Sequence, residues 1–511
     1  MRQHTTPSAD PGRNAAPAPA PARAATTEPV SGAGAAGESR ANSGAGPLLL
    51  LGQTLEFDAA PDPCHPERAA RHRSGGAVLV REGRIADIGE ADALCTRHPE
   101  AARVDHGNAL ISAGFVDAHV HYPQTGIIAS WGKRLLDWLE HYTFPEEMRF
   151  GDPDHARQIA GLYFDLVLAE GTTSVASYCT IHPESVDAFF EAAAARGMRV
   201  WAGKTCMDQN APEGLRDTPR SAYDDSRALA DRWHGRGRAS YVITPRFAPT
   251  SSAAQMDALG ALWAERPECL MQTHLSEQAE ELDWVARVHP GARDYLDIYE
   301  RHGLLGARGV YGHAIHLTPR EVDRLAEAGA GLVHCPTSNA FIGSGLFQAA
   351  SLRRRGLRLG LATDTGGGSS FSMLRTMAAA YEISQLAGTP LHPAELWWMA
   401  TGGAAEALHC EAVGHLRIGA EADLVVLDLA STPAIAQRAA RADNFWEALF
   451  PTIMMGDDRA VLETRVAGVV ARPAAGRFAE AVSGDGAGAL AGVGAEQDVD
   501  ADASLPARGA C

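Results

Sequence analysis

The stretch GFVDAHVH, residues 114–121, predicts a short apolar strand that ends in two histidines. In a strand, residues i and i+2 point to the same face, so the imidazoles of His119 and His121 can reach one metal ion. Such a pair does not establish a metal site alone, because the chain has 20 histidines and packing explains many of them. Candidate ligands elsewhere in the chain are therefore needed to support a metal site.

Seven further apolar stretches predict strands, and the gaps between them are long enough for helices. They are TTSVASY (172–178), MRVWAG (198–203), SYVITPRF (240–247), CLMQTHL (269–275), GVYGHAI (309–315), GLVHCP (331–336) and LRLGLATD (357–364). Helical spacing of apolar residues occurs between them, at 223–233 and 319–328. Eight β/α repeats predict an α/β fold, a closed (β/α)₈ TIM-type barrel with its active site at the carboxyl ends of the strands.

Three more candidate metal ligands stand where predicted strands end. His274 ends the fifth strand, His313 the sixth and Asp364 the eighth. Each alone has an ordinary structural interpretation, and Asp364 could simply cap the glycine-rich turn that follows it. In a closed barrel, however, all three meet the His119–His121 pair at one rim. Imidazoles together with a carboxylate predict a metal site.

Glu277 is the candidate general acid and base. It lies three residues beyond His274, at a predicted strand-to-helix junction. A carboxylate there can take a proton from a metal-activated water and return it to the substrate. Without the metal site, Glu277 would be interpreted as a helix-start glutamate stabilised by the helix dipole.

The same rim carries candidate substrate contacts. Arg246 and Phe247 close the fourth predicted strand, and Gln124 follows the histidine pair by three residues. An arginine and an amide suit a flat ligand that has carbonyl and ring-nitrogen edges. Phe247 and Trp131 either cover a ring face or belong to the core.

Both ends of the folded region predict further strands, which can pair into one small flanking sheet. These are LLLLGQTLEF (48–57), AVLVREGRIADIG (77–89), ADLVVLDL (422–429) and LETRVAGVVA (462–471). The segments outside them are rich in small residues and predict disorder. The predicted division is a disordered tail (1–46), the first part of a small β-sandwich domain (47–110), the barrel (111–412), the second part of the β domain (413–473) and a disordered tail (474–511).

Composition excludes several classes of function. With 45 basic and 63 acidic residues, the net charge is −18, which argues against nucleic-acid binding. No window approaches the roughly 20 apolar residues that a membrane span requires. The eight cysteines form no C-x-x-C pair, so neither a disulfide framework nor a thiolate zinc site is indicated. A reducing cytoplasm fits best.

From about Leu48 to Ala471 the chain resembles the guanine deaminases of the amidohydrolase superfamily. The stretches that carry the resemblance are GFVDAHVHYPQTGIIASWGKRLLDWLEHYTFPEE (114–147), GKTCMDQNAPEGLRD (203–217), ITPRFAPTSS (243–252), QTHLSEQAEEL (272–282), HCPTSNAFIGSGLF (334–347) and DTGGGSSFSML (364–374). Two departures, Ala340 and an insert at 58–73, lie away from the predicted site.

The resemblance implies zinc-dependent hydrolysis of guanine to xanthine and ammonia by a homodimer. It implies one zinc ion per subunit, held by His119, His121, His274 and Asp364. His313 would contact either the metal or its water, a choice that stays open. The implied catalytic residues are Glu277, Asp364 and His313. The implied substrate contacts are His121, Gln124, Arg246, Phe247, His274, Glu277 and Asp364.

Two alternatives remain open at this point. A pterin, a triazine or another purine could be the substrate of the same fold and metal, because the identity of the pocket depends on few side chains. A non-catalytic barrel used as a binding scaffold is the alternative from another class. A panel of substrates distinguishes the first alternative from guanine deamination. The zinc content of the purified protein distinguishes the second alternative from an enzyme.

Overall fold

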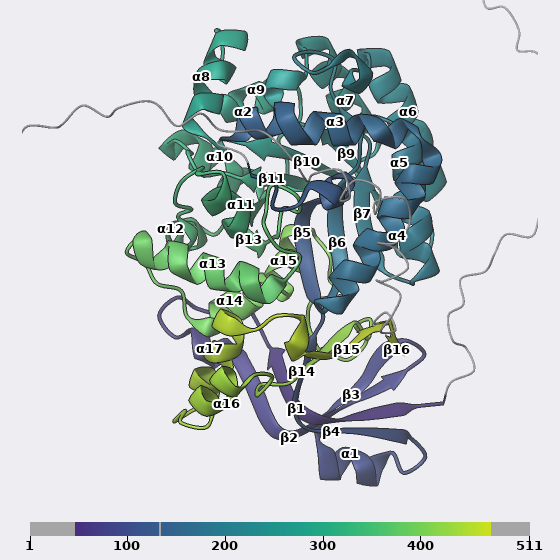
Figure 1. Ribbon diagram of the computed structural model, residues 1–511, viewed down its shortest axis with the longest axis vertical. Helices are drawn as coiled ribbons and strands as arrows, with labels where there is room; N and C mark the ends of the chain where they lie inside the picture. The colour runs from purple at the N-terminus through teal and green to yellow at the C-terminus, as the bar shows by residue number, and fades with distance from the viewer. Residues whose placement is uncertain (1–45, 132–133, 472–511) are drawn as a thin grey trace, which may run out of the picture. The chain divides into compact units, whose positions relative to one another are not determined.

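The computed structural model describes residues 46–131 and 134–471, and its largest sheet has nine strands, eight of which lie side by side in one parallel series. All eight predicted barrel strands are confirmed, and they follow one another in the order of the sequence (Figure 1). They are β5 (Phe115–His121), β6 (Thr172–Tyr178), β7 (Arg199–Gly203), β9 (Ala239–Pro245), β10 (Leu270–Leu275), β11 (Gly309–His313), β12 (Gly331–His334) and β13 (Arg358–Leu361); the short β8 (Thr205–Cys206) pairs with β9. Apart from Gly46, the predicted tails lie outside the described residues.

Main-chain hydrogen bonds between β5 and the segment after β13 bring the two ends of this sheet together. The amide of Asp364 donates to the carbonyl oxygen of His119 at 3.0 Å, and that of His121 donates to the carbonyl oxygen of Thr365 at 2.6 Å. Nearby, the buried carboxylate of Asp117 accepts a bond from the amide of Thr363 at 3.0 Å. The sheet therefore closes into the predicted (β/α)₈ barrel.

Helices fill the gaps between the strands, and local sequence defines their ends. Both predicted helices are confirmed, since 223–233 lies within α6 (Pro219–Trp233) and α10 spans Pro319–Ala328. Thr318 caps α10 with its side chain, and Gly329 ends the helix at a φ of 67° that favours glycine. The other barrel helices are α4 (Pro153–Ala169), α5 (Pro183–Ala195), α7 (Ala253–Glu265), α8 (Ala279–Val288), α9 (Tyr295–Arg301), α11 (Pro336–Phe341), α12 (Ala349–Arg354), α13 (Met373–Leu386), α14 (Pro393–Met399) and α15 (Gly402–Ala407).

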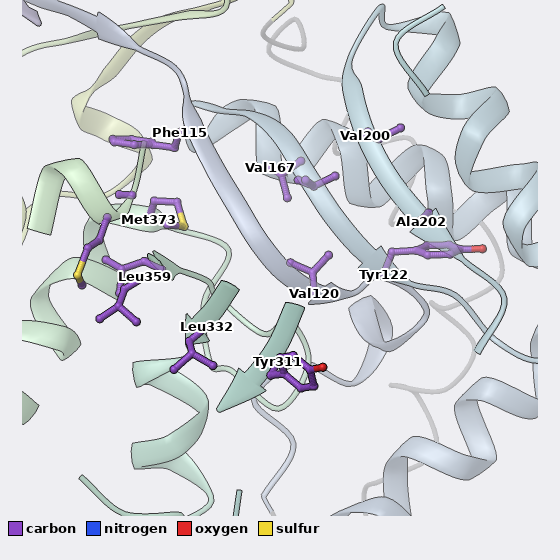
Figure 2. Packing of buried hydrophobic residues seen from close by; sticks show 14 of the residues in the cluster. Phe115, Val120, Tyr122, Val167, Val200, Ala202, Tyr311, Leu332, Leu359 and Met373 are labelled. Carbon is purple, nitrogen blue, oxygen red and sulfur yellow. The ribbon is translucent and has the colours of Figure 1, made fainter. Parts of the chain in front are cut away.

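Alternation along the strands divides the core into two layers. One set of apolar side chains fills the inside of the barrel, comprising Val116, Ala176, Trp201, Val242, Leu270, Val310 and Val333. The neighbouring strand residues face outward, where Tyr311 and Leu332 belong to the same cluster as Val167 of α4 and Met373 of α13 (Figure 2). Because the inside is packed with side chains, the barrel leaves room for a ligand only at its rim.

A second sheet is built from both ends of the folded region, as predicted. Its seven strands run in the order β16-β15-β14-β4-β1-β2-β3, and β4 pairs antiparallel with β14 across the two chain ends. The strands are β1 (Leu48–Phe57), β2 (Ala70–Arg81), β3 (Arg84–Glu90), β4 (Ala102–Ala113), β14 (Leu424–Leu427), β15 (Val461–Val466) and β16 (Val469–Val470). The insert at 58–73 forms the β1–β2 connection and the beginning of β2.

Partly buried ion pairs join the barrel to this sheet. Arg199 of β7 makes two bonds to Glu421, at 2.8 and 2.6 Å, and Arg238 pairs with both Glu421 and Asp423. The side chain of Asp423 is fully buried. A charged carboxylate is costly to bury unless it is paired. The charged form of Asp423 is therefore stabilised by Arg238.

Two further observations concern the described residues as a whole. Across 46–131 and 134–471, no helix combines the length and the apolar character that crossing a membrane requires. The cysteines in this part of the chain are all free thiols.

Candidate active site

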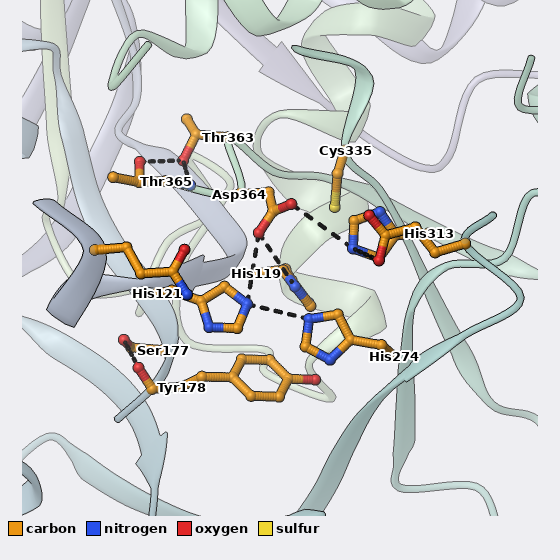
Figure 3. A network of polar contacts seen from close by, with 12 residues as sticks. His119, His121, Ser177, Tyr178, His274, His313, Cys335, Thr363, Asp364 and Thr365 are labelled. Carbon is orange, nitrogen blue, oxygen red and sulfur yellow. Dashed lines mark hydrogen bonds and ion pairs between the residues drawn. The ribbon is translucent and has the colours of Figure 1, made fainter. Parts of the chain in front are cut away.

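Four histidines and one aspartate converge at the carboxyl end of the barrel (Figure 3). His119 and His121 come from β5, His274 from β10 and His313 from β11, while Asp364 follows β13. The Nε2 atoms of His121 and His274 are 3.1 Å apart. Oδ1 of Asp364 lies 3.5 Å from Nε2 of His119 and 3.6 Å from Nε2 of His121. The structure thus brings together every predicted metal ligand.

The backbone near these five residues has two unusual features: a glycine that leaves room for His119, and two non-glycine residues in left-handed conformations. Gly312 faces His119, and a Cβ atom added there would lie 2.6 Å from Cε1 of the imidazole. Any side chain at position 312 would therefore displace the ring. His313 and Asp364 adopt left-handed backbone conformations, with φ of 65° and 50°. Such strain in non-glycine residues is typical of functional sites.

Hydrogen bonds at Nδ1 determine which nitrogen of two rings faces the cluster. Nδ1 of His274 donates to the carbonyl oxygen of Arg246 at 2.7 Å, because a carbonyl can only accept. Nδ1 of His313 is 2.8 Å from Oδ1 of Asn339. In both rings Nε2 is left with its lone pair directed into the cluster, which is the form that binds metals.

Burial keeps three imidazoles of the cluster neutral. It lowers the pKa of His119, His121 and His274 well below the usual value, and neighbouring positive charge lowers each further. Burial also raises the pKa of Asp364 to about 7. A carboxylate among buried neutral imidazoles is the ligand set that divalent metals use.

The residues present fit a metal ion. Nε2 of His119 and Nε2 of His313 are buried, and neither has a hydrogen-bond partner within the described chain. Two groups of potential ligand atoms lie within 4.8 Å of one another; one is His119, His121 and His274, and the other is His119, His313, Cys335 and Asp364. Cys335 is an addition that the sequence did not suggest. Orphaned nitrogens that converge with a carboxylate define a candidate metal site.

A pocket opens beside the cluster. Every predicted substrate contact lines it, whereas His119 lies deeper. The lining residues are His121, Gln124, Leu135, Trp138, Leu139, Arg246, Phe247, His274, Glu277, His313, Ser338, Ile342, Asp364 and Gly367. Apolar side chains and a few polar groups that converge are typical of a small-molecule site.

One of the two aromatic residues considered for a ring face is placed elsewhere. Trp131 is 77% exposed and does not line the pocket, so the interpretation that it covers a ring or belongs to the core is wrong. It precedes α2 (Leu135–Trp138), and Trp138 at the end of that helix is the buried tryptophan of the pocket. Phe247, in contrast, lines the pocket and also belongs to a buried apolar cluster.

Glu277 stands between β10 and α8, as predicted, with its carboxylate in the pocket. Its Oε2 lies 3.6 Å from Nε2 of His313. Burial and the neighbouring Glu281 raise the pKa of Glu277 well above the usual value. Glu281 also accepts a bond from the amide of Glu277 at 2.8 Å, which fixes the backbone at this position.

Comparison with known proteins places the chain in a family. Residues 110–470 match the amidohydrolase family. Guanine deaminase of Escherichia coli K12 is 40% identical over 402 residues, which are 78% of this chain and 92% of that protein. The chain belongs to the guanine deaminases of the amidohydrolase family. The rat guanine deaminase is 30% identical over 73% of this chain and 85% of its own length. Residues 76–101, in the flanking sheet, match an imidazolonepropionase-like composite domain of bacteria.

Solved structures of family members superpose on nearly their whole length. The E. coli guanine deaminase aligns with a TM-score of 0.81 at 38% identity, covering 83% of this chain and 99% of that one. The guanine deaminase of C. acetobutylicum, solved with guanine in its active site, gives a TM-score of 0.76 at 26% identity, with 83% and 100% covered. All the site residues described above lie within residues 110–470 of this chain, the region that matches the amidohydrolase family.

Sequence reasoning missed two buried residues that support the site. Glu147 bonds to both Gln124 and Arg246, and Asn339 orients His313. Asn339 belongs to the quoted stretch 334–347, and its place in α11, directly after a barrel strand, was the available signal. Glu147 ends the stretch 114–147 that carries the resemblance, but its role was not evident there, because it follows Glu146 in a segment that looks like an ordinary acidic helix start.

Proposed function

We propose that this chain catalyses the hydrolytic deamination of guanine to xanthine and ammonia. One pocket supports the proposal. It is lined by potential metal ligands and Glu277, and also by the polar side chains of Gln124 and Arg246. A flat ring with a carbonyl group fits between these two ends. Membership of the guanine deaminases supports the same substrate.

His119, His121, His274 and Asp364 would hold one zinc ion per subunit, because their donor atoms face one another. When bound, zinc lowers the pKa of water and so supplies a nucleophile at neutral pH. Nε2 of His313 lies 3.6 Å from Oε2 of Glu277 and 3.7 Å from Oδ2 of Asp364, so His313 would contact either the metal or its water.

Glu277 and Asp364 are assigned the proton transfers. As water adds to C2 of guanine, Asp364 takes a proton from the water and Glu277 gives one to N3. A proton then passes to the exocyclic amine, the bond between C2 and the amine breaks, and ammonia leaves. The sum is guanine plus water giving xanthine plus ammonia.

Arg246 and the apolar wall are assigned to binding and specificity. Arg246 donates to the O6 carbonyl of guanine, while Phe247 and Trp138 lie against the ring. Adenine carries an amine where guanine carries O6, so one donor would face another and leave buried groups unpaired. Sites built around such hydrogen bonds discriminate strongly.

A substrate panel tests the proposal. Purified zinc-loaded protein is incubated with guanine, adenine, cytosine, a pterin and an aminotriazine, and each product is identified by liquid chromatography. Xanthine from guanine, with no product from adenine or cytosine, is the expected result. Turnover of the pterin or the triazine in preference to guanine would favour the alternative substrate class. Zinc binding without any turnover would favour a scaffold.

A cytoplasmic homodimer, with the domain limits given from the sequence, completes the proposal. It is supported by the family resemblance and by the free thiols of the described residues. Light scattering of the purified full-length chain measures the oligomeric state, and a monomeric mass would contradict it.

A further inference from the structure

A buried glutamate behind the pocket joins the two polar residues of its wall. Oε1 of Glu147 accepts a bond from Nε2 of Gln124 at 2.8 Å, and Oε2 accepts one from Nη1 of Arg246 at 2.6 Å. Glu147 lies in α3 (Phe144–Met148) and is fully buried, yet it does not belong to the described lining of the pocket. It can therefore act on a bound ligand only through Gln124 and Arg246.

The contact with Gln124 fixes which end of the amide faces the ligand. A carboxylate accepts hydrogen bonds and cannot donate them, so the amide turns its NH₂ group toward Glu147. Oε1 of Gln124 is then an acceptor, and this buried atom has no hydrogen-bond partner among the described residues. Because Gln124 lines the pocket, its Oε1 is available to an N–H group of the ligand.

The contact between Glu147 and Arg246 places a negative charge beside the positive charge of the guanidinium. The guanidinium is always protonated, and two other carboxylates, those of Glu277 and Asp364, line the same pocket. The ion pair with Glu147 gives the Arg246 guanidinium a carboxylate partner of its own at the wall of the pocket. The guanidinium N–H groups not used by Glu147 remain donors for a ligand carbonyl.

We infer that Glu147 is a positioning residue that sets the hydrogen-bond pattern of the pocket, an acceptor at Gln124 beside donors at Arg246. The inference rests on the proposed function and names the basis of its specificity. The O6 and N1–H edge of guanine matches this pattern. 2,6-Diaminopurine carries the same leaving amine at C2, but presents an amine and a bare ring nitrogen at that edge, so it is mismatched at both positions.

Glu147→Gln tests the inference, because it preserves shape but keeps only one acceptor. Its amide NH₂ can donate to Oε1 of Gln124, which allows the Gln124 amide to turn. We expect kcat/KM for guanine to fall by about 10²-fold and the preference for guanine over 2,6-diaminopurine to fall at least about tenfold. Glu147→Asp keeps the charge and both acceptors, and is expected to retain more of the preference.

Glu146→Gln is the matched control. Glu146 is the preceding residue and is also buried, but it bonds to Arg149 and His155. We expect it to keep the wild-type preference. Zinc content and thermal melting of each variant establish that the proteins compared are folded and loaded. A double variant with Gln124→Ala should show a smaller effect of Glu147→Gln on the preference, because the two changes act through one contact.

The outcomes separate this inference from the proposed function. Wild-type protein without guanine turnover would overturn the proposed function, and this inference with it. Wild-type turnover together with an unchanged preference in Glu147→Gln, or an equal loss for both substrates, would overturn this inference alone. A reduced preference in Glu147→Gln, retained in Glu146→Gln, would support it.

Discussion

Nδ1 of His274 lies 2.7 Å from the carbonyl oxygen of Arg246. This bond links the cluster of potential metal ligands to the pocket wall that is assigned to substrate recognition. It fixes the tautomer of the imidazole and, at the same time, the end of β9 from which the Arg246 side chain projects. Metal binding and substrate placement therefore depend on the same short segment of backbone.

Glu277→Gln should separate catalysis from metal binding. The amide cannot exchange protons, so we expect kcat to fall by about 10²- to 10⁴-fold while zinc content stays at the wild-type level. Steady-state kinetics and elemental analysis measure the two quantities. Glu280→Gln, in the same turn but largely exposed, is the control and should keep its activity. Near-normal kcat in Glu277→Gln would remove the assigned role.

Gly312→Ala should weaken metal binding without breaking the barrel. The new Cβ would lie 2.6 Å from the ring of His119, which must move. We expect reduced zinc occupancy after dialysis against a weak chelator, together with a smaller rise in melting temperature when zinc is added. Gly161→Ala, where nothing lies within 4 Å of the added Cβ, should behave as the wild type. Full occupancy in Gly312→Ala would show that His119 is not a ligand.

Arg246→Leu should cost stability as well as activity, because it leaves the carboxylate of Glu147 buried without its cation. The loss is expected to be about 3 kcal/mol, typical of a buried pair with one partner removed. Adding Glu147→Gln to this variant should recover part of the free energy of unfolding but none of the guanine turnover. Chemical denaturation and kinetics measure both. Unchanged guanine kcat/KM in Arg246→Leu would contradict its role.

Arg238→Met should loosen the junction between barrel and flanking sheet. Without Arg238, the fully buried carboxylate of Asp423 loses the guanidinium that is paired with it, so we expect a loss of about 3 kcal/mol in unfolding free energy. Arg220→Met, which breaks the exposed pair with Asp224, should change the unfolding free energy little. Equal effects of the two substitutions in chemical denaturation would show that the buried junction contributes nothing special.

The barrel and its cluster of potential metal ligands could be predicted from the sequence for a physical reason. Parallel strands in a closed barrel all end at one rim, so His119, His274 and Asp364 had to meet there once the strand count was known. Both periodicity and the chemistry of the ligands point to the same positions. The flanking sheet was predictable in the same way, because strands such as β1 and β14 carry dense apolar runs.

Residues that act from connecting segments were harder to predict. Glu147 lies 26 residues beyond His121 and reaches the site through α3, whose position depends on tertiary packing. Trp131 and Trp138 are seven residues apart, and nothing in the sequence says which one turns inward. Asn339 contacts His313 only because α11 follows β12 closely. These placements depend on the fold as a whole.

The most direct test of the account is the fate of oxygen from water. Zinc-loaded protein is supplied with guanine in H₂¹⁸O, and the product is examined by mass spectrometry while ammonia is measured enzymatically. We predict xanthine with one ¹⁸O atom at C2 and an equal amount of ammonia, with Glu277→Gln forming neither at a comparable rate. Recovery of unlabelled guanine alone, with zinc bound, would contradict the central claim that this chain is a guanine-hydrolysing enzyme.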